Sequence, residues 1–279
     1  MSQEVSSASI LCMAVSGITA FAIPIILFIY FRRKKRADIL PFFVGCAVLL
    51  VFALVLESCL HQAVLKSPIG QKIMSNVWLY ALYGGAAAAL FEETGRLIAF
   101  KTVLRKRLNN NANALMYGAG HGGLEAAAIA GIGAINNIIY SEMLNSGSIS
   151  TITDKLSGDA AAQFSNIVQQ LITLPSYYFL FSGVERIFGA VLQISLSVLV
   201  WFAVKKRGKL HLFFIALAIH FTADAAVAVM SGYKFNTAAL EAAIGVFSAA
   251  TAIFVLWVWK KECSAEKHSA QSDDQSMLS

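Results

Sequence analysis

The stretch ASILCMAVSGITAFAIPIILFIYF, residues Ala8–Phe31, is followed directly by the basic run RRKKR, residues Arg32–Arg36. The stretch holds no charged side chain, and it exceeds the about 20 residues that span a hydrocarbon core of about 30 Å. It is too long for the core of a signal peptide, and no basic residue precedes it. We therefore interpret it as a retained first membrane span.

The rest of the chain repeats this pattern of apolar blocks and basic runs. Of 279 residues, 57% are apolar and 14% are charged, whereas soluble domains average about 45–50% and about 25%. The expected spans are Ala8–Phe31, Leu40–Leu60, Asn76–Phe100, Ala112–Ile139, Gly183–Val204, Leu210–Met230 and Ala239–Trp259. The sequence thus predicts an all-α, polytopic membrane helix bundle of about seven transmembrane helices, located in the plasma membrane.

The basic residues predict how this bundle is oriented. Although the net charge is +6, the Lys and Arg residues follow apolar blocks in short runs, which is typical of topology signals and not of a nucleic-acid groove. The runs are Arg32–Arg36, Lys101–Arg107, Lys205–Lys209 and Lys260–Lys261. All four lie on the cytoplasmic side if the N-terminus is outside. We expect one bundle domain at residues 1–261 and a disordered cytoplasmic tail at residues 262–279.

One further apolar segment, Gln163–Phe181, is not expected to span the membrane. Counting it as a span would move the basic run Lys205–Lys209 to the outside. Its Gln169 and Pro175 are more typical of an interfacial or re-entrant segment. We therefore expect it at the outer interface.

Several ionisable residues lie inside the predicted spans, where each costs about 2.5–3.5 kcal/mol at the bilayer centre. The third span carries Glu92, Glu93 and Arg96 in FEETGR, the fourth carries His121 and Glu125 in GHGGLE, and the sixth carries His220 and Asp224 in HFTAD. With a rise of about 1.5 Å per residue, each set lies roughly 12–15 Å from the cytoplasmic end of its helix. We therefore predict a single polar layer built by three helices, about halfway across the membrane.

The two neighbouring glutamates are expected to differ in role. Their side chains point about 100° apart on a helix, and Arg96 follows Glu92 by four residues and Glu93 by three. One carboxylate can pair with Arg96 for charge balance, while the other faces the cavity as a general base. The sequence leaves open which glutamate is the base.

The two histidines repeat one local pattern. His121 and His220 are each followed four residues later by an acid, Glu125 and Asp224 respectively, on the same helix face. Each acid can orient its own histidine, or both groups can face a shared ion or water. The glycines around His121 predict a close approach of neighbouring helices.

This constellation resembles the CAAX-protease and bacteriocin-processing superfamily of intramembrane proteases, and within it the YhfC-type branch of metalloproteases. Glu92, Glu93 and Arg96 match the glutamate motif, Tyr117 and His121 match the aromatic-xxx-His motif, and His220 and Asp224 match the His-xxx-Asn/Asp motif. The chain departs from the pattern in the spacing of Arg96, which follows two intervening residues and not three, and in Tyr117, which replaces the usual Phe. The resemblance covers the third to the sixth span and implies an intramembrane endopeptidase.

The resemblance also implies a set of site residues. The catalytic residues would be Glu92, Glu93, Arg96, His121, His220 and Asp224, supported by Tyr117 and Glu125. A zinc ion held by His121, His220 and Glu93 would match the ligands of catalytic zinc. In a metal-free alternative a glutamate is the base, and His220 with Asp224 stabilises the oxyanion.

The expected partners are the lipid bilayer and a peptide or membrane-protein substrate, with no nucleic acid. Two other functions remain open from the sequence. Carboxylates and imidazoles inside a bundle also build the relays of proton- or metal-coupled transporters. A non-catalytic immunity or partner protein could keep the same bundle.

Overall fold

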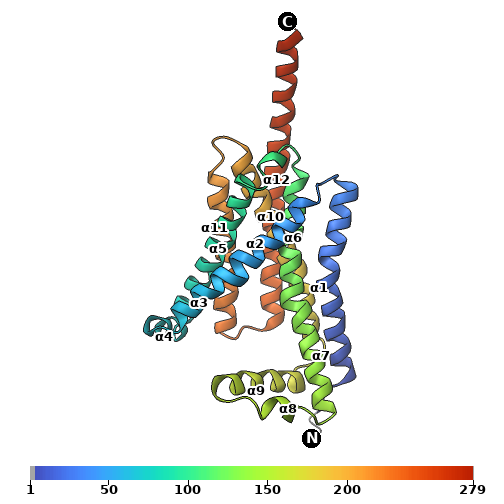
Figure 1. The fold of residues 1–279 in the computed structure, drawn as a ribbon, viewed down its shortest axis with the longest axis vertical. Helices are drawn as coiled ribbons and strands as arrows, with labels where there is room; N and C mark the ends of the chain where they lie inside the picture. The colour runs from blue at the N-terminus through green and yellow to red at the C-terminus, as the bar shows by residue number, and fades with distance from the viewer. Residues whose placement is uncertain (1–3, 279) are drawn as a thin grey trace.

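The computed structural model describes residues 4–278, with side chains as far as residue 266. Within this range every regular element is a helix and there is no strand. Six helical segments are long and apolar enough to cross a membrane, and α4 (Pro68–Met74) with α5 (Val77–Lys101), bent by 110°, makes a seventh if the pair counts as one span. The predicted all-α polytopic bundle is confirmed (Figure 1).

The predicted spans correspond to the observed helices, with differences at their ends. The other spans are α1 (Ser7–Lys34); α2 (Leu40–Val48) with η1 (Leu49–Glu57) and α3 (Ser58–Leu65); α6 (Ala112–Ala126) with η3 (Ala127–Gly131) and α7 (Ile132–Asn145); α10 (Tyr178–Lys205); α11 (His211–Gly232); and α12 (Thr237–Leu278). Both η1 and η3 are π-helical. Such wider turns are frequent at functional sites.

The basic loops meet at one end of the bundle, opposite the start of α1 (Figure 1). The short helix η2 (Arg105–Arg107) lies there, and Arg107 pairs with Asp38 at 3.0 Å. Lys205 donates to Asn111 over 2.7 Å, and Lys206 pairs with Glu262 at 3.1 Å. The clustering is the arrangement that the positive-inside rule requires. That this end is cytoplasmic stays a prediction.

The end of the chain differs from the predicted disordered tail at 262–279. Helix α12 continues past residue 261 to Leu278. Glu262 pairs with Lys209 at 2.8 Å, and Glu266 pairs with Lys205 at 2.9 Å. These ion pairs to the end of α10 and the following loop fix the first turns beyond the span, and a polar composition alone gives no sign of such partners. Residue 279 lies outside the described residues.

The predicted interfacial segment 163–181 is divided between two elements. Most of it lies in α9 (Gly158–Thr173), which is not among the candidate spans. Together with α8 (Ser150–Thr153), α9 lies across the end of the bundle that carries the N-terminus (Figure 1). Residues 178–181 instead begin α10, so the fifth predicted span starts five residues earlier than Gly183.

Glycines allow α6 to lie at the centre of the bundle. A Cβ atom at Gly120 would collide with the carbonyl group of Phe42 in α2, and one at Gly123 would lie 2.6 Å from Pro24 of α1. Only glycine permits these backbone approaches. Because α1, α2 and α10 all pack against α6, His121 is fully buried, with 0% exposure.

The Asp38 carboxylate should stabilise the basic end in a pH-dependent way. Burial opposes its ionisation, but hydrogen bonds from Arg107 and Asn113 outweigh burial and lower its pKa below the usual 3.8. The stabilisation is therefore present above about pH 4 and lost as the pH falls through the folded-state pKa. Asp38→Asn should cost about 0.2–1 kcal/mol at pH 7, as for exposed pairs. Thermal unfolding should show the wild type to be more stable than Asp38→Asn at pH 7, with little difference in stability at pH 3. An equal difference in stability at both pH values would contradict the prediction.

Candidate functional site

Three helices bring their predicted polar residues together inside the bundle. Glu92 of α5 places its Oε2 atom 2.8 Å from Nε2 of His121 in α6 and 3.8 Å from Nε2 of His220 in α11. Asp224 of α11 lies 3.4 Å from the same His220 nitrogen. The residues that the sequence places in one layer therefore lie within contact distance of each other.

Glu93 faces away from the pocket and is tied to two partners. Its Oε1 atom accepts hydrogen bonds from Arg96 and, over 2.8 Å, from Nδ1 of His220. Both Glu93 and Arg96 have 0% exposure. An ionised carboxylate only accepts, so Nδ1 of His220 carries a proton. Nε2 of His220 is then the atom that faces Asp224 and Glu92.

Glu92 is the glutamate that lines the pocket. Its Oε2 atom is held by His121 and by Nε2 of Gln193, which donates over 3.0 Å. Its Oε1 atom has no hydrogen-bond partner within residues 4–266. One oxygen is thus anchored, and the other is free for a ligand. Of the two glutamates, Glu93 and not Glu92 pairs with Arg96.

Gln193 of α10 is a site residue that the sequence analysis missed. It is 4% exposed and accepts a hydrogen bond from Arg96 through Oε1. Its Nε2 atom donates to Glu92 and, over 3.1 Å, to Glu125. Arginine has no acceptor, so these partners fix which end of the amide is which. The only sign of its role in the sequence was a polar glutamine inside an apolar span, and this sign is weak because the side chain is uncharged.

Arg186 is a second residue at the site that the sequence analysis did not identify. From sequence it and Glu185 suggest an interfacial pair far from the layer, and the two do pair. Arg186 also pairs with Glu125 at 3.0 Å, and both Arg186 and Glu185 line the pocket. The carboxylate of Glu125 is consequently held by Arg186 and Gln193 and does not orient His121 through a hydrogen bond.

A second polar cluster lies beside the site at the end of the π-helical turn η1. His61, a residue without expected chemistry, lies 3.0 Å from the Tyr83 hydroxyl and 3.2 Å from Glu57. Glu57 interacts electrostatically with Glu92 and Asp224. Within residues 4–266, Glu57 makes no hydrogen bond to Glu92, His220 or Asp224.

One group of described side chains could hold a metal ion. Glu92, His121 and Glu125 each offer a ligand atom within 4.8 Å of the others. This set differs from the predicted His121, His220 and Glu93. The Glu93 carboxylate instead accepts hydrogen bonds from Arg96 and His220. The imidazole nitrogen and carboxylate oxygen 2.8 Å apart must share a proton or another cation. The donor types fit a divalent metal.

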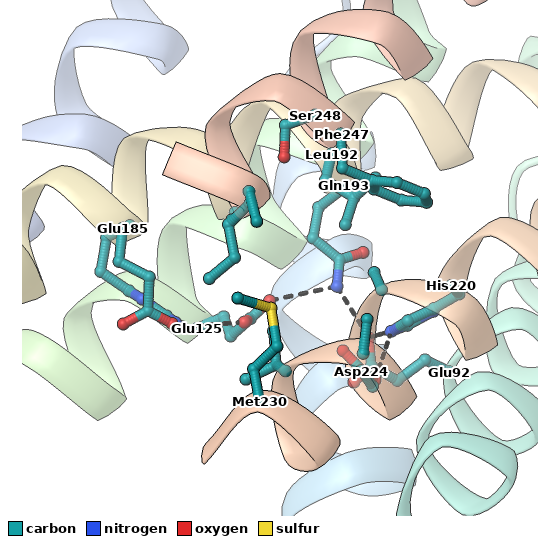
Figure 2. Close-up of a pocket in the computed structure, with 17 residues that line it drawn as sticks. Glu92, Glu125, Glu185, Leu192, Gln193, His220, Asp224, Met230, Phe247 and Ser248 are labelled. Carbon is teal, nitrogen blue, oxygen red and sulfur yellow. Dashed lines mark hydrogen bonds and ion pairs between the residues drawn. The ribbon is translucent and has the colours of Figure 1, made fainter. Parts of the chain in front are cut away.

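The pocket beside this cluster has a volume of about 260 Å³ and lies between α5, α6, α10, α11 and α12. Figure 2 shows Glu92, Glu125, Gln193, His220 and Asp224 around it, with Met230, Leu192 and Phe247 also lining it. One water occupies about 30 Å³ of liquid. The space therefore suits several waters or a short peptide segment with an apolar side chain. Behind the layer, the Tyr117 ring stacks on His121 at a centroid distance of 6.0 Å.

A family model described as YhfC intramembrane metalloprotease matches residues 19–246, which include the polar residues of this site from Glu92 to Asp224. The chain belongs to the YhfC intramembrane metalloprotease family. It is 35% identical over 257 residues to the "uncharacterized membrane protein YhfC" of Bacillus subtilis (strain 168), an alignment that covers 92% of this chain and 97% of that protein. No solved structure matches significantly. The family name and the spans together make this a multi-pass membrane protein.

Gln193 should hold the polar layer of this YhfC family member together. Gln193→Leu leaves one Arg96 donor without its acceptor and removes one hydrogen bond from each of two carboxylates, Glu92 and Glu125, which keep His121 and Arg186. Each buried group left unpaired costs about 1–3 kcal/mol. We expect destabilisation of about 2–3 kcal/mol, measured by denaturant unfolding in detergent. Gln169→Leu, at an exposed position of α9, is the matched control and should change little. Equal effects of the two replacements would show that the Gln193 contacts carry no stability.

Proposed function

We propose that this protein hydrolyses a peptide bond of a membrane-protein or peptide substrate, with Glu92 as general base. The observation that carries the proposal is the difference between the two glutamates. Glu93 is fully buried and tied to Arg96 and His220. Glu92 is anchored through Oε2 and lines the pocket with Oε1 unpaired in the described chain.

The pocket residues can carry the reaction in balanced steps. Glu92 Oε1 takes a proton from water, and the water oxygen attacks the peptide carbonyl carbon. The carbonyl oxygen becomes an oxyanion that accepts a hydrogen bond from His220 in its protonated form, which Glu93 and Asp224 flank. The carbon–nitrogen bond then breaks, and the proton held by Glu92 passes to the leaving nitrogen.

Zinc is the metal that we propose for the cluster of Glu92, His121 and Glu125. Imidazole nitrogen and carboxylate oxygen are both ligands of zinc in proteins. The ion would supply Lewis-acid polarisation of the substrate carbonyl. Gln193 and Arg186 orient the two carboxylates by hydrogen bonds, as outer partners of metal ligands do.

Cleavage in reconstituted vesicles tests this function. Purified protein is mixed with a panel of single-span peptides in liposomes, and products are identified by mass spectrometry. We expect cleavage that a zinc chelator stops and added zinc restores. Glu142→Gln, at an exposed position of α7, should leave the rate unchanged. Movement of protons or metal ions down a gradient without any cleavage would instead support a transporter.

A further inference from the structure

A second groove lies on the lipid-facing side of the bundle, away from the catalytic pocket. Helices α1 and α12 each pack against α10, and the groove runs between them at the basic end, with a volume of about 530 Å³. Its floor is buried, with Phe31 at 7%, Val198 at 2% and Val255 at 5% exposure. Its rim is open, since Tyr30 is 46% and Leu256 is 58% exposed.

The residues that line this groove are mostly apolar, so the groove suits an apolar ligand. The hydroxyl group of Ser195, one of its few polar atoms, already donates to the carbonyl of Val191 over 2.7 Å. The Ser195 hydroxyl therefore needs no partner from a ligand. Tyr30 and Trp259 stand at the same end of the groove as the basic loops, and such aromatic residues are typical of the headgroup level of a bilayer.

One positive charge remains at the mouth. Lys35 lines the groove, and no acidic side chain of residues 4–266 pairs with it. The acids close to this end are engaged elsewhere: Asp38 pairs with Arg107, and Glu262 pairs with Lys209. An exposed ammonium group above an apolar groove is complementary to an anionic head with a hydrocarbon tail.

The size of the groove decides between a lipid chain and a protein helix. A spanning helix about 10 Å wide and about 30 Å long fills roughly 2,400 Å³, about twice the 1160 Å³ that is free of atoms in the groove and the open space at its rim. A single hydrocarbon chain is far thinner and reaches only halfway across the bilayer. We propose that this groove binds one acyl chain of an anionic phospholipid whose phosphate contacts Lys35.

Lipid retention measured by native mass spectrometry tests the proposal without reference to catalysis. The full-length protein is exchanged into detergent containing equal amounts of phosphatidylglycerol and phosphatidylcholine. We expect preferential retention of one phosphatidylglycerol. Lys35→Gln should weaken the preference about fivefold, which corresponds to about 1 kcal/mol for one cation at an anionic surface. Lys101→Gln makes the same charge change at an exposed position of α5 outside the groove and should have no effect.

A second variant tests the apolar part. Ala252→Trp fills the groove and should remove the bound lipid, whereas Ile253→Trp, 70% exposed and outside the groove, should not. If Ala252→Trp does not fold, the Lys35 comparison decides alone. Equal retention of both lipids, equal effects of Lys35→Gln and Lys101→Gln, or a second protein copy in place of the lipid would overturn the proposal. Inorganic phosphate should not compete with the lipid, because it lacks the tail.

Discussion

Replacing Glu92 by Gln should lower the rate of peptide cleavage by about 10²–10⁴-fold, the usual contribution of a general base. The amide cannot take a proton from water, but it has nearly the same shape and can still contact His121. We therefore expect unfolding curves close to those of the wild type. Initial cleavage rates in vesicles, normalised to the amount of folded protein, measure the effect.

The matched comparison for Glu92→Gln is its neighbour. Glu93→Gln removes a buried charge that Arg96 and His220 contact, so we expect it to lower both stability and activity. A loss of activity without a loss of stability should thus be specific to position 92. If Glu92→Gln cleaves at the wild-type rate, Glu92 is not the base.

Replacing Arg96 by Met should destabilise the protein by about 3–5 kcal/mol, since the buried Glu93 carboxylate loses its arginine and keeps only His220 as a partner. Arg96 is fully buried and donates to Glu93 and to Gln193. Methionine keeps much of the side-chain volume but provides no donor. Denaturant unfolding in detergent measures the change, and Arg105→Met, at an exposed position, is the control.

A double replacement separates lost charge pairing from lost packing. Buried ion pairs can often be exchanged for apolar residues at little cost. Arg96→Met combined with Glu93→Leu should therefore recover part of the stability lost in Arg96→Met alone. A double variant that is less stable by the sum of both single effects would show that lost packing, and not the loss of the charged partner of Glu93, causes the destabilisation.

The site residues that the sequence predicted are those whose side chains have a large free-energy cost of insertion into a membrane. Charged Glu92, Glu93 and Asp224 stand out in apolar spans, and helical rise alone places them at one depth. Gln193 was missed because an uncharged amide gives a weaker signal. Its role depends on the rotation of α10 about its axis, which spacing along the chain does not specify.

The sequence also did not predict which charged side chains form ion pairs with each other. Arg186 reaches Glu125 only because α6 and α10 pack closely through glycine positions such as Gly122, where a Cβ atom would lie 2.9 Å from Gln193. The helical continuation after residue 261 depends on ion pairs between distant segments, such as that of Glu262 with Lys206. Periodicity predicts elements, whereas these contacts follow from how the elements pack.

The metal content of the purified protein tests the central claim, that Glu92, His121 and Glu125 form one metal-binding centre. We expect about one zinc ion per chain, as in catalytic zinc sites, in the wild type and in His211→Ala, whose imidazole is exposed at the start of α11. His121→Ala should lose the ion while remaining folded. A wild type without bound metal after zinc loading, or a His121→Ala variant that keeps its zinc, would contradict this account.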